Sequence, residues 1–254
     1  MTGAEPLGVI RLGQVSYRQA HALQRALVDR RIEGAIQRDL LLLLEHEPTV
    51  TLGRGTRAGS LPLPPEELEA QGLTVVEVER GGDVTWHGPG QLVGYPILDL
   101  HHHREDLHWY LRQVEQALIM GLARMEIPAE RNPGYTGVWT EGRKIASIGI
   151  HVRQWVTSHG FALNVVNDLA GFDLIVPCGI SGVEMTSVAG ERRRQGQNGP
   201  PDGDAGDLYE ATVAATIAGV GEVFGRCPEP ATLAELLPAG TLPDPGTFPG
   251  RGPR

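Results

Sequence analysis

The sequence predicts an α/β (α+β) domain built on a mixed β-sheet with helices packed on it. Short apolar or alternating segments at residues 8–12, 39–45 and 73–78 are typical of strands. Longer segments with apolar side chains every three or four positions predict helices, of which residues 107–125 form the longest. The two kinds of element follow one another without regular strand–helix–strand alternation, which disfavours a doubly wound fold or a barrel.

The ends and turns of these segments place further elements along the chain. Ser16 is a suitable N-cap for a helix whose apolar positions extend to Ile32. A glutamate–glycine turn at residues 141–142 joins residues 138–140 to residues 144–152 and predicts a hairpin. Other strands are expected at residues 49–52, 92–98 and 159–165, and other helices at residues 66–71, 207–224 and 231–237.

Composition limits the class of protein and its environment. The 254 residues, 41% apolar and 21% charged, are typical of a soluble globular protein with a sizeable core. No apolar run is long enough to span a membrane, and residues 1–11 lack the pattern of a signal peptide. Two cysteines do not make a disulfide framework, so the expected location is a reducing cytoplasm. The net charge of −9, without a basic stripe, argues against nucleic-acid binding.

Three polar or irregular segments lie outside the predicted elements. Residues 191–206 predict a polar loop insertion with little to bury, in which the arginines at 192–194 mark a solvated surface. Residues 238–254 are rich in proline and glycine and predict a flexible tail. The histidines at residues 101–103 make a poor metal site, because consecutive side chains point in different directions. We therefore expect residues 1–237 to form one domain that needs no metal.

Lys144 is the only lysine in the chain, and the other 21 of the 22 Lys and Arg side chains are arginine. Arginine keeps its proton at any accessible pH, whereas an ammonium group can lose and regain one when its surroundings shift its pKa. The position that stays lysine therefore indicates proton transfer. The alternative is a chance surface lysine in a composition that is poor in lysine.

Cys178 is the candidate nucleophile. It lies between Pro177 and Gly179 at the end of an apolar stretch, where a bend can present the sulfur to a pocket. A reactive thiol must ionise, and Lys144 is the cation that could favour the thiolate. The alternative is a cysteine that serves as a small buried apolar residue. Cys227 has no comparable flanks and is interpreted as structural.

Residues 80–91, RGGDVTWHGPGQ, are too rich in glycine for the interior of a helix or strand. They match neither a phosphate loop nor a dinucleotide-binding pattern, and they could serve only as turns. Backbone N–H groups free of a strand ladder would suit recognition of a carbonyl group, with Arg80 and His87 as polar groups at the two ends. Residues 147–149 and 160–162 fall on neighbouring predicted strands, where small side chains would leave room for an apolar ligand.

Together these segments resemble the lipoyl(octanoyl) transferases. The resemblance covers about residues 40–188 and rests on residues 80–91, GRKIASIG at 142–149, GFALN at 160–164 and PCG at 177–179. It implies a cytoplasmic, monomeric acyltransferase that moves an octanoyl group from octanoyl-acyl carrier protein to one lysine of a lipoyl-domain protein, without a cofactor. It also implies the fold of biotin and lipoate protein ligases, in which a small second sheet accompanies the main one.

The resemblance assigns roles to particular residues. Cys178 matches the nucleophile that carries the acyl group as a thioester, and Lys144 the group that lowers its pKa, so that the two form a Cys/Lys dyad. The segments that match the lining of the acyl site supply Arg80, Gly81, Gly82, Asp83, Val84, Thr85, Trp86, His87, Ser147, Ile148, Gly149, Gly160, Phe161 and Ala162.

Two other functions are compatible with the same fold. An ATP-dependent lipoate or biotin protein ligase would need a nucleotide site and no nucleophilic cysteine. A non-catalytic module would bind a carrier protein without transferring the acyl group. Because carrier proteins and this chain are both acidic, docking is expected to use local arginines, with Arg54, Arg57, Arg143 and Arg153 as candidates.

Overall fold

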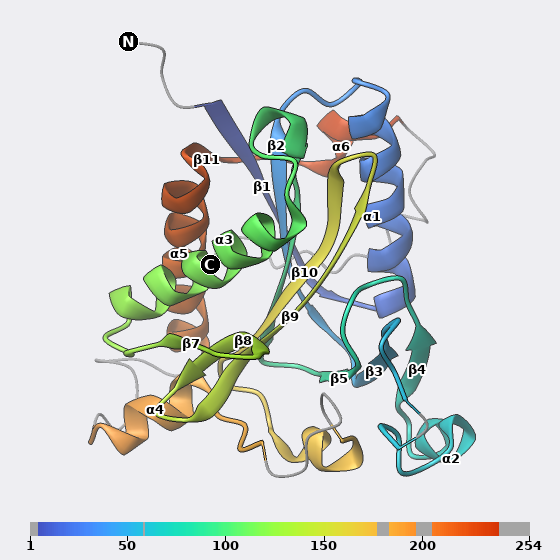
Figure 1. Cartoon of the computed structure of the whole chain (residues 1–254), viewed down its shortest axis with the longest axis vertical. Helices are drawn as coiled ribbons and strands as arrows, with labels where there is room; N and C mark the ends of the chain where they lie inside the picture. The colour runs from blue at the N-terminus through green and yellow to red at the C-terminus, as the bar shows by residue number, and fades with distance from the viewer. Residues whose placement is uncertain (1–4, 58, 177–182, 197–204, 239–254) are drawn as a thin grey trace.

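The structure is a computed structural model that describes residues 5–57, 59–176, 183–196 and 205–238. Cys178 and the predicted tail from residue 239 onward lie outside the described residues. The described chain forms two β-sheets, with helices on both faces of the larger one (Figure 1).

The main sheet has eight strands in the order β11-β1-β2-β6-β10-β9-β8-β7. The strands are β1 (Glu5–Val15), β2 (Asp39–His46), β6 (Gln91–Ile97), β7 (Glu130–Asn132), β8 (Tyr135–Thr140), β9 (Arg143–Arg153), β10 (Val156–Asn164) and β11 (Arg226–Pro230). Strand β1 pairs in parallel with β2 and β11, whereas the other neighbours are antiparallel. The predicted mixed sheet is confirmed.

The second sheet contains β4 (Thr74–Glu77), β3 (Thr49–Leu52) and β5 (Val84–His87), with the short helix α2 (Pro65–Ala70) beside it. Strand β3 is parallel to β4 and antiparallel to β5. The small sheet is therefore confirmed, but the prediction that residues 80–91 contain no strand is wrong. The four residues of β5 lie between two pairs of glycines, and their pairing with β3 outweighs the glycine content around them.

Helices cover the two faces of the main sheet. Helices α1 (Tyr17–Ile32) and α6 (Leu233–Leu236) pack on one face, and α3 (Leu107–Arg124) and α5 (Ala205–Phe224) on the other (Figure 1). The leucine run of β2 serves both faces, because Leu41 and Leu43 join the core under α3 and α5, while Leu40, Leu42 and Leu44 join the core under α1. Ser16 caps α1 as predicted, accepting a hydrogen bond from Gln19 N.

Residues 191–194 are helical, which corrects the prediction of a loop across residues 191–206. They belong to α4 (Val188–Arg194), which is capped by Ser187. Both Glu191 and Arg192 are buried, so the arginine cluster is not wholly a solvated surface. The physical reason is pairing: Glu191 accepts hydrogen bonds from Arg143 and from Thr186 Oγ1, which brings this polar segment onto the body of the protein.

Two edge strands, β7 and β11, were not predicted. Each is short, and β11 contains two prolines, so neither has the apolar alternation by which strands are recognised. Cys227 lies in β11 and is exposed. The remaining short elements are the 3-10 turns η1 (Leu100–His102) and η2 (Ala170–Leu174).

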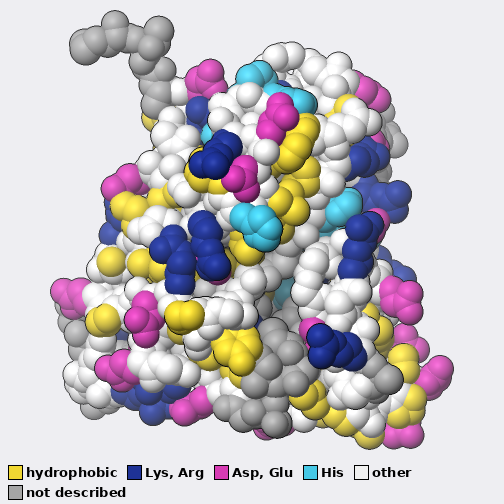
Figure 2. All heavy atoms as spheres, in the orientation of Figure 1, with side chains coloured by type: hydrophobic (Ala, Val, Ile, Leu, Met, Phe, Trp, Pro, Cys, Tyr) yellow, Lys and Arg dark blue, Asp and Glu magenta, His cyan; other side chains and the backbone are white. Residues whose placement is uncertain are grey.

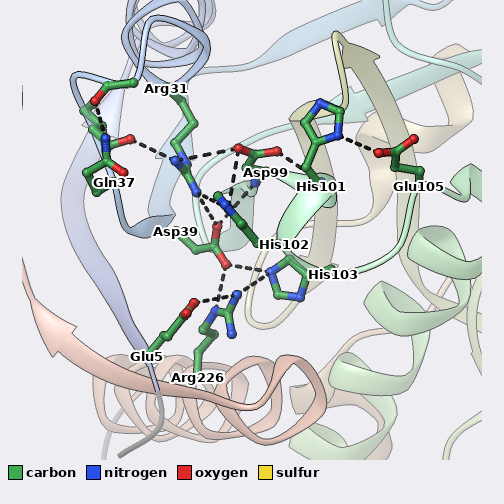
Figure 3. Close-up of polar contacts among 12 residues, drawn as sticks. Glu5, Arg31, Gln37, Asp39, Asp99, His101, His102, His103, Glu105 and Arg226 are labelled. Atoms are coloured by element: carbon green, nitrogen blue, oxygen red, sulfur yellow. Dashed lines mark hydrogen bonds and ion pairs between the residues drawn. The ribbon is translucent and has the colours of Figure 1, made fainter. Parts of the chain in front are cut away.

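A buried ionic group, here called the Asp39 cluster, consists of Arg31, Asp39, His103 and Arg226 (Figure 3). Asp39 Oδ2 accepts hydrogen bonds from His103 Nε2 at 2.6 Å and from Arg226 Nε at 2.9 Å, and Arg31 Nη2 lies 3.6 Å from Asp39 Oδ1. The three consecutive histidines do diverge as expected: His101 contacts Glu105, His102 contacts Arg31, and His103 contacts Asp39.

Acidic and basic side chains of the described residues are interspersed over the face drawn in Figure 2. Among the described residues, none of the helices combines the length and the apolar character that a membrane span requires.

Candidate active site

A cavity of about 380 Å³ lies where β9 and β10 of the main sheet meet β5 of the small sheet. Most of the predicted site residues line it: Arg80, Gly82, Asp83, Val84, Thr85, His87, Lys144, Ser147, Ile148, Gly149, Gly160, Phe161 and Ala162. Three segments far apart in the sequence therefore meet at one place.

Two predicted residues do not line the cavity. Trp86 packs against Phe172, with a ring-centroid separation of 5.4 Å, and belongs to the apolar core of the small sheet. Gly81 donates its N–H to Ile150 O at 2.9 Å and so ties the glycine-rich segment to β9. Cys178 lies outside the described residues, so its distance from the cavity is not part of the structure.

The glycines of β9 and β10 create contacts between protein segments. The two strands pair Gly149 with Gly160, which confirms that these residues lie on neighbouring strands. A Cβ atom at Gly149 would lie 2.8 Å from Arg80 Cδ, and one at Gly160 would lie 2.3 Å from Gly94 O. The expected room for a ligand is thus occupied, at these two positions, by Arg80 and by strand β6.

Arg80 fixes the wall formed by the glycine-rich segment. Its buried guanidinium donates to Thr51 O and Thr51 Oγ1, both at 2.8 Å, and to Asp83 O at 2.7 Å. The Asp83 carboxylate in turn accepts hydrogen bonds from Ser60 Oγ and from Val84 N. Because these bonds use backbone carbonyls on two segments, Arg80 holds the segment against the small sheet.

Lys144 lies on β9 and is 4% exposed, although its side chain lines the cavity. Its stem passes over Gly137, where a Cβ atom would lie 2.8 Å from Lys144 Cε, and Nζ lies 5.7 Å from the centre of the Trp139 ring. A chance surface lysine is therefore excluded. The chain's one lysine is held inside the protein beside a cavity, where a small cation that can exchange its proton has a chemical use.

The backbone of Lys144 holds the segment that follows the undescribed residues 177–182. Lys144 N donates to Glu184 O at 2.8 Å, and Lys144 O accepts from Thr186 N at 2.9 Å. On the other side of those residues, Val176 N donates to Ser60 O at 2.9 Å. Both described ends are thus attached to residues that line or support the cavity.

A group of aromatic and histidine side chains beside the cavity was missed by the sequence analysis, apart from His87. This group, here called the cavity cluster, consists of Tyr17, His46, His87, Tyr95 and His159. All but His46 line the cavity, and His46 lies behind them. No local motif could have grouped them, because they come from five separate segments that only the sheet brings together.

Burial keeps these histidines neutral. It lowers the pKa of His46 to about 4 and the pKa of His159 to about 3, and it brings the pKa of His87 well below its usual value. Burial also raises the pKa of Tyr17 to about 12. Apart from histidines and tyrosines, the ionisable residues among the described lining are three basic ones, Arg57, Arg80 and Lys144, and one acidic one, Asp83. This excess of basic residues favours an anionic group in the cavity.

Comparison with known proteins now places the chain. The family described as the lipoyl protein ligase A/B catalytic domain matches residues 16–197. An octanoyltransferase from Nostoc sp. is 52% identical over 177 residues, covering 70% of this chain and 79% of the relative. The chain belongs to the octanoyltransferases of this family. It is therefore an acyltransferase that acts in protein lipoylation.

Other octanoyltransferases extend the match. One from Geobacter sulfurreducens is 52% identical over 186 residues, covering 73% of this chain and 76% of the relative. One from a Synechococcus strain is 42% identical over 250 residues, covering 91% of this chain and 88% of the relative.

Solved structures bear on the fold alone, because their sequences are distant. A lipoate-protein ligase A bound with ATP is 14% identical, with a TM-score of 0.68 over 91% of this chain and 90% of that one. A bi-partite lipoate protein ligase from Thermoplasma acidophilum is 15% identical, with a TM-score of 0.64 over 91% of this chain and 88% of that one. The predicted resemblance to lipoate protein ligases in fold is confirmed.

Proposed function

We propose that this octanoyltransferase takes its octanoyl group from octanoyl-acyl carrier protein, holds it as a thioester on Cys178, and delivers it to a lysine of a lipoyl-domain protein. Lys144 carries the proton in both steps, and the reaction takes place in the cytoplasm without a cofactor. The observation that supports this most is the burial of the chain's only lysine beside the cavity.

Chain geometry supports a Cys178–Lys144 dyad. Cys178 follows Val176 by two residues, so their Cα atoms can be at most about 7 Å apart. Val176 is bonded to Ser60, whose hydroxyl donates to Asp83 in the cavity wall. The chain that resumes after Cys178 is bonded to the backbone of Lys144 itself. Both described ends of the chain that flank Cys178 are thus attached at the cavity, which supports the proposed dyad.

The chemistry balances without ATP. In the first step the Cys178 thiolate attacks the thioester carbonyl, the bond to the carrier thiol breaks, and that thiol leaves with the proton from Lys144. In the second step the amine of the acceptor lysine attacks the Cys178 thioester and loses a proton to neutral Lys144, while Cys178 leaves as a thiolate. Exchange of one thioester for another is nearly balanced, and amide formation from a thioester is favourable.

The cavity walls offer both parts of the required binding site. Ile148, Phe161, Val84 and Ala162 supply apolar surface for the octanoyl chain, to which each buried methylene contributes about 0.8 kcal/mol. Backbone N–H groups of the glycine-rich segment can bind the oxyanion that forms during attack, a contribution of about 3 kcal/mol in other acyl-transfer enzymes.

Intact-mass analysis tests the thioester. After the enzyme is mixed with octanoyl-acyl carrier protein, the wild type should gain one octanoyl group, and Cys178→Ala should gain none. Cys227→Ser is the matched control, because Cys227 is exposed on β11 and should leave the gain unchanged. Transfer at a normal rate by Cys178→Ala, or a requirement for ATP, would contradict the thioester route and favour a ligase. Binding of the carrier without any transfer would favour a non-catalytic module.

Of the four arginines considered for docking the carrier protein, those near the cavity are the best candidates. Arg143 is paired with Glu191 and Glu141, and Arg153 with Asp29, whereas Arg54 and Arg57 are exposed. Arg57 also lines the cavity. Arg57→Glu should raise the Michaelis constant for the acyl donor several-fold at low salt, and Arg153→Glu should not. If both substitutions changed the Michaelis constant equally, Arg57 would not be part of a specific docking site for the carrier protein.

A further inference from the structure

Three side chains with metal-binding atoms meet behind the wall of the acyl cavity. His21 comes from α1, Glu79 follows β4, and His159 comes from β10. Glu79 Oε2 lies 2.8 Å from His21 Nε2 and 3.8 Å from His159 Nε2, and the three candidate ligand atoms all lie within 4.8 Å of one another. Two imidazole nitrogens and a carboxylate oxygen are a common set of zinc ligands.

The contact at His159 Nδ1 permits the tautomer whose Nε2 atom can bind a metal. The Tyr17 hydroxyl lies 3.4 Å from His159 Nδ1 and can accept a hydrogen bond from it. A histidine that donates through Nδ1 to an oxygen and presents a bare Nε2 has the arrangement found in most metal-binding histidines.

The backbone at His159 is also unusual for a residue within a strand. Its φ angle is 55°, in the left-handed region that residues with a side chain rarely adopt, and its N–H donates to Gln24 Oε1 of α1 at 2.8 Å. Strained conformations of this kind concentrate at functional sites. Here the strain and the contact with α1 accompany a side chain that faces both the acyl cavity and a second, smaller cavity.

The second cavity offers space for the rest of a coordination sphere. It has a volume of about 80 Å³, and its lining includes His21, Glu79, His151 and His159. This volume exceeds what one water molecule needs. A metal at the three ligand atoms would therefore have an open side on which water can bind.

Nearby arginines reduce the expected affinity without blocking the site. Arg25 approaches Glu79 at 3.9 Å, but through Oε1 and not through the Oε2 atom that faces the histidines, and its side chain is 68% exposed. Arg153 also lines the small cavity, but its charge is paired with Asp29. The positive charges are thus partly screened or compensated, and the carboxylate oxygen that the metal needs is accessible.

We propose that His21 Nε2, Glu79 Oε2 and His159 Nε2 bind a zinc ion, with water as the fourth ligand. Tetrahedral zinc with ligands at about 2.05 Å separates neighbouring ligand atoms by roughly 3.3 Å, so the observed spacings require shifts of less than about 1 Å for the closer pairs. The ion would join α1, the segment after β4 and β10, and would brace the wall of the acyl cavity from behind. This site is independent of the proposed thioester chemistry.

Metal binding is measured on tag-free, chelator-treated full-length protein. Titration calorimetry with Zn²⁺ should give one site with a dissociation constant of about 10 μM or tighter. Zinc at a hundredfold excess over that constant should raise the unfolding midpoint by roughly 5 °C, because a ligand that binds only the folded state stabilises it. Mg²⁺ at the same concentration should not bind, since imidazole ligands do not suit it.

Zinc affinities of substituted proteins test whether the ion binds at these three residues or elsewhere. His21→Gln and Glu79→Gln should each weaken zinc binding at least tenfold and remove the thermal shift. His101→Gln is the matched control, because His101 also contacts a carboxylate, Glu105 at 2.6 Å, but belongs to no three-ligand group among the described residues. Co²⁺ in place of zinc should show no thiolate charge-transfer band, which excludes Cys227 and Cys178 as ligands. No binding by the wild type at 100 μM zinc, or equal binding by wild type and both site variants, would overturn the proposal.

Discussion

The Asp39 cluster and the cavity cluster lie at opposite ends of strand β2, which begins at Asp39 and ends at His46. In the Asp39 cluster, hydrogen bonds and ion pairs among four side chains compensate the buried charges, and these side chains line neither of the two cavities described above. In the cavity cluster the histidines are neutral, and four of the five side chains line the cavity of about 380 Å³. Compensated charges hold backbone segments together, whereas neutral polar groups at a cavity keep hydrogen-bonding capacity for a ligand.

The largest effect is expected on the rate of octanoyl transfer, from substitutions of Lys144 in the cavity that leave the Asp39 cluster intact. Lys144→Arg keeps the positive charge but removes proton exchange, so the rate of octanoyl transfer should fall by about 10²–10⁴-fold. Lys144→Gln, which also removes the charge, should be at least as impaired. Single-turnover transfer assays give the rate, and circular dichroism checks that both variants are folded. Near-normal turnover by Lys144→Arg would contradict the proton-transfer role.

A substitution in the Asp39 cluster should lower the stability of the fold without changing octanoyl transfer. Asp39→Asn removes the counter-charge that Arg31 and Arg226 share. Breaking a buried pair typically lowers the free energy of unfolding by about 3–5 kcal/mol. Arg31 keeps a contact with Asp99 and Arg226 one with Glu5, so the loss should lie near the lower end of that range. Urea unfolding measures the loss, while transfer per folded molecule should be unchanged. Glu235→Gln, in the exposed pair with Arg38, is the control and should leave the free energy of unfolding almost unchanged. A similar small loss for Asp39→Asn would remove the distinction between the clusters.

A smaller effect on transfer is expected from substituting Gly137, which lies against the side chain of Lys144. A Cβ atom at Gly137 would lie 2.6 Å from Ala146 O and 2.8 Å from Lys144 Cε, so Gly137→Ala should destabilise the fold by about 1–3 kcal/mol and displace the amine. Transfer should slow about tenfold. At Gly134, which also lines the cavity, a Cβ atom would have no neighbour within 4 Å. Gly134→Ala should therefore retain most activity; equal losses in the two variants would point to backbone strain as the cause.

A further contrast between the two clusters concerns the pH dependence of stability. Burial holds the pKa of His46 at about 4, below its usual 6.5, so between these values the unfolded chain binds a proton that the folded protein does not. Stability from His46 is full above pH 6.5 and falls by up to about 1.4 kcal/mol per unit as the pH drops toward 4. His46→Gln should flatten the curve of unfolding free energy in this range, and a slope equal to that of the wild type would contradict the assignment.

The Asp39 carboxylate should act in a different pH range. Despite the opposing effect of burial, hydrogen bonds and charge interactions with His103 and Arg226 lower the pKa of Asp39 below 3.8. Its stabilising contribution is therefore present above that value and is lost as the pH falls below it. In the Asp39→Asn variant only the part of the curve below about pH 4 should flatten, which distinguishes the two clusters in one set of titrations.

The fold was predictable where local sequence and tertiary pairing agree. The leucine run of β2, the Ser16 cap and the hairpin of β8 and β9 each have a local signal that the structure confirms. Strands β5, β7 and β11 were missed for different local reasons. Strand β5 is only four residues long and lies between glycines, β7 consists of polar residues, and β11 contains two prolines. Partner strands provide the hydrogen bonds in all three. Helix α4 was likewise missed, because its polar sequence is held on the protein by the pairing of Glu191 with Arg143, a residue distant in the chain.

Site residues that belong to continuous sequence motifs were predicted, whereas isolated ones were not. Residues 80–87, 147–149 and 160–162 were found because each has an uninterrupted motif, and most of their residues line the cavity. Tyr17, Tyr95 and His159 also line it, but each is a single residue in an ordinary helix or strand. A lone histidine or tyrosine gives no signal until the sheet brings it beside the others.

By itself, the sequence determined the mixed sheet, the family and the special position of Lys144, because these depend on apolar periodicity, long motifs and a residue count. Only the tertiary structure decided that Lys144 is buried beside a cavity and that the glycines of β9 and β10 make room for Arg80 and β6. It also decided that the Asp39 cluster and the cavity cluster lie at the two ends of strand β2. Burial, charge compensation and the distances between side chains are properties of residues that are distant in the chain, so no local pattern can encode them.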